Sequence, residues 1–212
     1  MKQRSFVKRF GYNILHLLCR LVGVIFFRVR VKGRENQLTG GALICSNHQS
    51  FFDPVLVGLA FEDRMNYLAR KTLFKFPPFR WLIEYLDAIP IDRTGMGLQG
   101  IKETLRRLKR SEMVLIFPEG TRTRDGSVGR LKPGFVALAR RGKRPLIPVG
   151  LDGAYDAWPR NSTLPQLSSI HICIGEPITV EEIEQWSDEE VVAELERRIR
   201  ECHQQARLGR EV

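Results

Sequence analysis

One histidine and one aspartate, five positions apart, are the side chains in this sequence best suited to acid–base chemistry. His48 comes shortly after the apolar residues 42–45, which are typical of a buried strand, and Asp53 follows it. Imidazole changes protonation near neutral pH and can take a proton from a hydroxyl, and a nearby carboxylate can fix its tautomer. Taken alone, the pair fits a general base or a capped turn. Asn47 fits either an oxyanion donor or a turn cap, and we expect the cap.

A second polar segment, residues 118–122, follows the strand-like apolar run at 113–117. Gly120 lets the backbone approach a ligand closely, and the planar fork of Arg122 matches phosphate oxygens. On its own the segment fits either an anion site or a polar turn with a solvated arginine.

Together the two segments resemble the glycerolipid acyltransferase family, of the type that acylates lysophosphatidic acid. Four blocks carry the resemblance in the family's order: residues 47–53, 70–77 with 91–93, 117–122 and 146–149. The likeness covers roughly residues 40–152 and is weaker toward both ends of the chain. Thr123 stands where the family often has serine, and it keeps the hydroxyl.

The resemblance implies acyl transfer from a thioester, acyl-CoA or acyl-carrier protein, to a hydroxyl of an acylglycerol phosphate. His48 would be the general base and Asp53 its orienter, with neither a cofactor nor a metal. The acceptor would be held by Glu119, Gly120, Thr121 and Arg122, with Arg122 on the phosphate, Glu119 organising the turn, and Lys71 and Arg93 as second candidates. A thioester is already activated, and the sequence has no Gly-x-Ser-x-Gly elbow for a serine acyl-enzyme.

The charge of the chain predicts an anionic partner. Its 34 lysines and arginines exceed its 24 aspartates and glutamates, for a formal net charge of +10. Nucleic acid and anionic lipid both fit this excess, but the sequence shows no zinc-finger spacing, RNA-binding aromatic signature or clear helix-turn-helix. We therefore expect a membrane lipid surface and no nucleic acid. The four cysteines are far apart, which predicts neither a metal site nor a disulfide framework, and indicates a reducing compartment.

The segment at residues 10–27 is apolar but is interrupted by His16 and Arg20. A central arginine is costly in a membrane span, so we expect a helix lying in the membrane interface with basic neighbours on anionic headgroups. A true span and a helix packed on the domain are the alternatives. We therefore divide the chain into a membrane-interface segment at 1–28 and an acyltransferase-like domain at 29–212, located at the cytoplasmic face of the membrane.

Strand-like and helix-like segments alternate along the chain, which predicts an α/β fold, a single layered domain with a mixed central β-sheet flanked by helices. Expected strands are residues 26–31, 42–46, 66–69, 89–91, 113–117, 145–151 and 170–174. Expected helices are residues 54–61, 79–85, 97–110, 134–141 and 187–205, with a capped helix start at 179–182.

The leading hypothesis is an enzyme that makes phosphatidic acid from lysophosphatidic acid. The same chemistry on glycerol-3-phosphate, another lysophospholipid or a lyso-aminolipid is a close alternative. A non-catalytic lipid-binding module and a nucleic-acid binder are the remaining hypotheses. The acyl-chain length, the type of donor and the oligomeric state are not encoded in any motif that we find.

Overall fold

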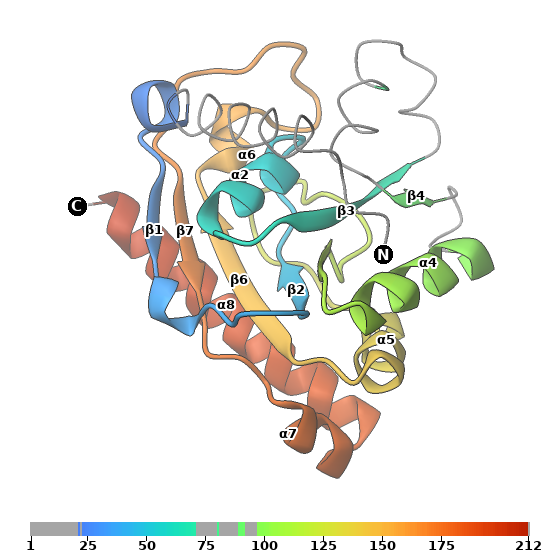
Figure 1. Cartoon of the computed structure of the whole chain (residues 1–212). Helices are drawn as coiled ribbons and strands as arrows, with labels where there is room; N and C mark the ends of the chain where they lie inside the picture. The colour runs from blue at the N-terminus through green and yellow to red at the C-terminus, as the bar shows by residue number, and fades with distance from the viewer. Residues whose placement is uncertain (1–20, 22, 71–79, 81–88, 92–96, 212) are drawn as a thin grey trace.

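The computed structural model of the chain describes residues 21, 23–70, 80, 89–91 and 97–211 (Figure 1). Seven strands form one sheet in the order β1-β7-β6-β2-β5-β3-β4. The strands are β1 (Arg30–Lys32), β2 (Leu43–Ser46), β3 (Met65–Arg70), β4 (Ile89–Ile91), β5 (Met113–Ile116), β6 (Leu146–Asp152) and β7 (His171–Ile174). Every neighbouring pair is parallel except β6 and β7, which are antiparallel, so the predicted mixed sheet is confirmed.

Helices flank the sheet on both faces, as the sequence predicts. They are the 3-10 helix η1 (Arg34–Asn36) and the α-helices α2 (Asp53–Ala60), α4 (Gly97–Lys109), α5 (Gly134–Gly142), α6 (Ala154–Ala157), α7 (Val180–Gln185) and α8 (Asp188–Glu211). The predicted cap of α7 is confirmed, because the Thr179 hydroxyl and the Glu182 carboxylate each accept the other residue's backbone N–H. The expected helix at 79–85 lies outside the described residues, apart from residue 80.

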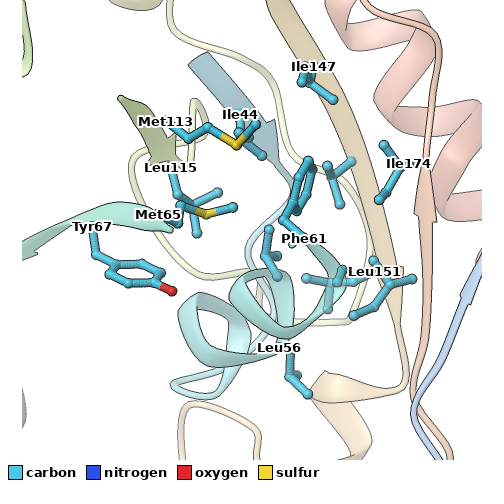
Figure 2. Packing of buried hydrophobic residues seen from close by; sticks show 14 of the residues in the cluster. Ile44, Leu56, Phe61, Met65, Tyr67, Met113, Leu115, Ile147, Leu151 and Ile174 are labelled. Carbon is cyan, nitrogen blue, oxygen red and sulfur yellow. The ribbon is translucent and has the colours of Figure 1, made fainter. Parts of the chain in front are cut away.

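Two apolar clusters sandwich the sheet and hold these layers together. On one face Leu56 and Phe61, from α2 and its end, lie with Ile44 of β2 and Leu151 of β6 (Figure 2). On the other face Leu43 of β2 packs with residues of α4, α5 and α8. All four residues of β2 are buried, as expected for a central strand covered on both faces.

The long helix α8 approaches the sheet closely where it crosses β6. A Cβ added to Gly150 would lie 2.1 Å from the backbone nitrogen of His203, so only glycine fits between the two backbones. The side chains of Cys173, Cys202 and Ala206 pack together beside this crossing. Gly150 therefore sets the depth at which α8 covers the sheet.

The first strand begins later than the sequence predicts. Residues 23–27 are helical, and β1 starts only at Arg30. Arg28 has a φ of 43°, a left-handed conformation that ends a helix, so the alternating apolar pattern at 26–31 spans a helix end and a strand start. Most of the expected interface helix at 10–27 lies outside the described residues. Within the described part of the chain, no helix is both long and apolar enough to cross a membrane.

Candidate active site

The connection between β2 and α2 holds His48 and Asp53 together. The Nδ1 atom of His48 lies 2.6 Å from Oδ2 of Asp53. The same oxygen accepts hydrogen bonds from the backbone N–H groups of Gln49 and Ser50, at 2.6 and 2.7 Å. Asp53 is fully buried in the first turn of α2, where the partial positive charge of a helix N-terminus favours a carboxylate. The pair predicted from the sequence is therefore a real contact.

This geometry determines which nitrogen of His48 can accept a proton. Because Oδ2 of Asp53 already accepts two backbone N–H groups, it acts as an acceptor toward Nδ1, which therefore carries its hydrogen. The lone pair is then on Nε2. The His48 ring stacks on Phe117 with centroids 3.9 Å apart, and its side chain is 20% exposed. Asp53 thus fixes the Nδ1 side of the imidazole, and the ring stays accessible to a ligand.

Glu119 ties the turn after β5 to the backbone of His48. Its Oε1 accepts the His48 N–H at 2.8 Å and its Oε2 accepts the Gly129 N–H at 3.0 Å. The carbonyl of His48 in turn accepts the Thr123 N–H at 2.8 Å. Burial raises the pKa of Glu119, and the two backbone donors act in the opposite direction. Glu119 lies within the framework of the site, as the sequence-based role of turn organiser requires.

Arg122 leans over the aromatic ring of Phe51. Its Cζ lies 3.5 Å from the centroid of that ring, a cation–π contact that places the guanidinium next to the His48 segment. Phe51 in turn lies beside Trp158, with ring centroids 5.6 Å apart. The structure therefore brings Arg122 to the same end of the sheet as His48 and Asp53.

Gly120 and Thr121 complete the turn, and both are exposed. Gly120 has a φ of 71°, a conformation that favours glycine. A Cβ at this position would lie 2.9 Å from Nζ of Lys132, so the end of the lysine side chain lies next to the glycine. The backbone N–H of Lys132 donates to the carbonyl of Pro118 at 3.0 Å, which holds this lysine beside the turn.

Sequence reasoning did not single out Lys132, because only the fold brings it to Gly120. It also overlooked the buried Gln49, whose side chain donates to the Gly126 carbonyl and accepts from the Tyr155 N–H. For Lys132 there was no signal beyond its position before α5. For Gln49 the only signal was a polar residue next to His48.

The expected turn cap at Asn47 is wrong. Its side-chain amide donates to the carbonyl of Leu151 and accepts the N–H of the same residue, at 2.9 and 2.8 Å. These bonds join the end of β2 to β6 and use the oxygen and the nitrogen of the amide.

Two predicted site residues, Lys71 and Arg93, lie outside the described residues. In the described ranges, no group of three or more histidine, cysteine, aspartate or glutamate side chains is placed to hold a metal ion.

Known proteins share this sequence and fold. The profile of the acyltransferase family matches residues 28–152. A 1-acyl-sn-glycerol-3-phosphate acyltransferase of Bacillus subtilis is 31% identical over 80% of this chain and 81% of its own length. A protein of the same name from Pseudomonas aeruginosa is 34% identical over 74% of this chain and 61% of its own length.

A solved structure supports the same fold. The crystal structure of the 1-acyl-sn-glycerophosphate acyltransferase PlsC from Thermotoga maritima superimposes with a TM-score of 0.82 at 24% identity. The match covers 97% of this chain and 83% of that one. At this identity the likeness concerns the arrangement of helices and strands.

Proposed function

The chain belongs to the acyltransferase family, and we propose that it transfers a fatty acyl group from acyl-CoA or acyl-carrier protein to the free hydroxyl of 1-acylglycerol-3-phosphate. The product is phosphatidic acid, a precursor for phospholipid biosynthesis. The observation that carries this proposal is the hydrogen bond from Nδ1 of His48 to Asp53, which leaves Nε2 as a base. The names of the relatives from B. subtilis and P. aeruginosa support this acceptor.

In the proposed reaction Nε2 of His48 removes the proton of the acceptor hydroxyl while its oxygen attacks the thioester carbonyl. The new C–O bond forms, the C–S bond breaks, and the imidazolium returns the proton to the departing thiolate. Asp53 stabilises the imidazolium through Nδ1. No acyl-enzyme is needed, and Cys45, next to the motif, is a poor nucleophile because burial raises the pKa of its thiol.

The acceptor phosphate would bind at the turn of residues 119–122. Arg122 supplies a fork of donors, and Lys132 adds a second positive charge over Gly120. Thr121 is exposed in the same turn. Lys71 and Arg93 remain candidates for further contacts with the phosphate or the donor.

We place residues 1–28 at the membrane interface and the acyltransferase domain at 29–212, on the cytoplasmic face. The first 34 residues contain no aspartate or glutamate, which suits an anionic lipid surface. Leu21, Val24, Ile25 and Phe26 are exposed on the described part of the helix that ends at residue 27. A lipid partner at this end of the chain also matches the lipid acceptor proposed for the site.

The test is acyl transfer from palmitoyl- and oleoyl-CoA to lysophosphatidic acid, glycerol-3-phosphate and a zwitterionic lysophospholipid. We expect His48→Ala to lower kcat by about 10²- to 10⁴-fold, the contribution typical of a general base. Its melting temperature should stay close to that of the wild type, because the side chain is not part of the apolar core. Wild-type turnover in this variant would refute the mechanism.

Arg122 and its neighbour Arg124 offer a matched pair for the acceptor site. Arg122→Ala should raise KM for the phosphate-bearing acceptor, and Arg124→Ala, an exposed arginine two residues away, should leave it unchanged. Turnover confined to the zwitterionic lysophospholipid, whose phosphate is a diester, would keep the base and overturn the assignment of a phosphate monoester as the acceptor headgroup. If no acceptor reacts with either CoA thioester, the acyl-carrier protein thioester is assayed next, and failure there refutes the proposed reaction.

A further inference from the structure

Two leucines extend into solvent from the loop between α6 and β7. Leu164 and Leu167 are 72% and 77% exposed, among the most exposed large apolar side chains of the described chain. A single exposed leucine is ordinary on a protein surface. These two leucines differ from an ordinary exposed leucine in the position of their loop, residues 159–168.

Hydrogen bonds tie the 159–168 loop to the active-site segment. The Ser50 hydroxyl donates to the carbonyl of Trp158 at 2.9 Å, and Nε1 of Trp158 donates to the carbonyl of Ser162 at 3.1 Å. Within the loop the Ser162 hydroxyl donates to the Leu164 carbonyl, and the Gln166 N–H donates to Ala157. The leucines are therefore presented from a loop whose course is set beside His48 and Asp53.

The same loop borders the helix that ends at residue 27. The N–H of Ile170 donates to the Phe27 carbonyl at 2.9 Å. The Phe27 ring packs on Phe52, and Phe52 packs on Trp158, with centroids 5.4 and 4.8 Å apart. Figure 1 shows the helix in blue and the loop in orange at the same end of the molecule, at the top. The exposed apolar residues of both segments thus gather at one end, and we call them the apolar end: Leu21, Val24, Ile25, Phe26, Leu164 and Leu167.

The charged side chains within the two segments that carry the apolar end are positive. Residues 1–34 contain no acidic side chain, and neither do residues 157–175. Arg28, Arg30 and Arg160 are exposed in these segments. Apolar side chains surrounded by cations complement an anionic bilayer, whose headgroups attract the arginines while its acyl region takes up the leucines.

We propose that the 159–168 loop is a second membrane-contacting element, which inserts Leu164 and Leu167 into an anionic bilayer beside the N-terminal helix. Contact at two points, on either side of the Phe52–Trp158 contact, would set the orientation of the domain and hold His48 facing the membrane. The proposal rests on the proposed function in taking the acceptor to be a membrane lipid and residues 1–28 to lie at the membrane interface. A second copy of the chain is the competing occupant of this end.

The test compares the full-length wild type with the double variant Leu164→Ser/Leu167→Ser. A matched control is Leu98→Ser/Leu208→Ser, which removes two leucines that are 78% and 55% exposed on α4 and α8. Binding is measured by co-sedimentation with phosphatidylcholine vesicles that contain phosphatidylglycerol. We expect the loop variant to bind at least about tenfold more weakly and the control to bind like the wild type. Equal binding by the loop variant and the wild type overturns the proposal.

Two further measurements separate the possible outcomes. The ratio of turnover on bilayer-embedded lysophosphatidic acid to turnover on a water-soluble short-chain analogue should fall in the loop variant and not in the control. If the wild type acylates no acceptor, the proposed reaction fails, and the vesicle measurement still decides this inference. If the loop variant loses self-association in light scattering and keeps its vesicle binding, the apolar end is a dimer contact and the proposal is overturned.

Discussion

One oxygen atom of Asp53 orients both the imidazole ring of His48 and the loop that carries this histidine. Its Oδ2 accepts the Nδ1 hydrogen of His48 and also the backbone N–H groups of Gln49 and Ser50. The carboxylate therefore shapes the loop that carries the histidine and fixes the tautomer of the ring at the same time. The spacing of five residues fits this arrangement, because the carboxylate reaches back from the first helical turn to the loop before it.

Gly120 provides a test of the cationic turn. In Gly120→Ala the new methyl group would displace the ammonium of Lys132, and we expect acyl transfer to lysophosphatidic acid to fall at least about tenfold. The control is Gly40→Ala, because Gly40 also has a positive φ but has no atom within 4 Å of the added Cβ.

Both alanine variants should lose about 1–2 kcal/mol in the free energy of unfolding from backbone strain alone. Urea unfolding and the transfer assay separate the two effects. Normal activity in Gly120→Ala would show that Lys132 need not lie over the glycine.

The sequence indicated which described residues of the candidate site lie together more clearly than it indicated the hydrogen bonds between them. His48, Asp53 and residues 119–122 stand in short motifs, and local spacing is visible in a sequence. The bond from His48 to Glu119 joins residues 71 positions apart, and Lys132 reaches Gly120 from beyond the motif. Contacts of this kind depend on the pairing of β2 with β5 and leave no periodic signal.

At the level of elements, hydrophobic periodicity located most helices and strands within a few residues. The order of the strands was not predictable in this way, because apolar runs of similar composition pair equally well with several neighbours. The antiparallel pairing of β7 with β6 was likewise not predictable from the apolar runs. The start of β1 was misplaced because Arg28 has a left-handed conformation that separates a helix from the strand. The pattern of side chains does not indicate this conformation.

The crossing of α8 over β6 predicts a large effect of a small substitution. In Gly150→Ala the Cβ would lie 2.1 Å from the nitrogen of His203 and 2.3 Å from the carbonyl carbon of Cys202, so the helix backbone must move. We expect a loss of about 2–4 kcal/mol in the free energy of unfolding. Gly134→Ala is the control, since it adds a methyl in a helix with nothing within 4 Å and should be neutral or slightly stabilising. A neutral Gly150→Ala in urea unfolding would contradict this account of the packing.

Across the whole molecule, Asp152 joins the sheet to the C-terminal turns of α8. This buried carboxylate at the end of β6 lies 3.3 Å from His203, 3.6 Å from Arg207 and 3.1 Å from Arg210. Burial tends to raise the pKa of Asp152, but the hydrogen bond from His203 and the charges of Arg210, His203 and Arg207 together lower it.

A lowered folded-state pKa means that the unfolded chain binds a proton to Asp152 more readily. The stabilisation is therefore complete above the ordinary aspartate pKa of about 4 and is lost as the pH falls through the folded value. Asp152→Asn should cost about 1–3 kcal/mol in the free energy of unfolding at pH 7, and the difference from the wild type should shrink below about pH 4.

Urea unfolding at pH 7, 5 and 3 measures this difference. Asp156→Asn is the control, since this more exposed carboxylate pairs with Arg210 and should contribute well under about 1 kcal/mol. A difference for Asp152→Asn that does not change with pH would rule out the charge-based explanation.

The two hydrogen bonds between His48 and the turn after β5 also predict which chimeras of two relatives keep the site intact. Glu119 accepts a hydrogen bond from the N–H of His48, and the His48 carbonyl accepts one from the N–H of Thr123, so each segment supports the backbone of the other. A crossover between two relatives anywhere from residue 54 to residue 118 takes the base from one parent and its backbone support from the other. Chimeras joined before residue 42 or after residue 132 inherit both from a single parent. For the site to keep its contacts in a chimera, the paired strands β2 and β5 and their turns must therefore come from the same parent, and transferring either motif alone is not enough.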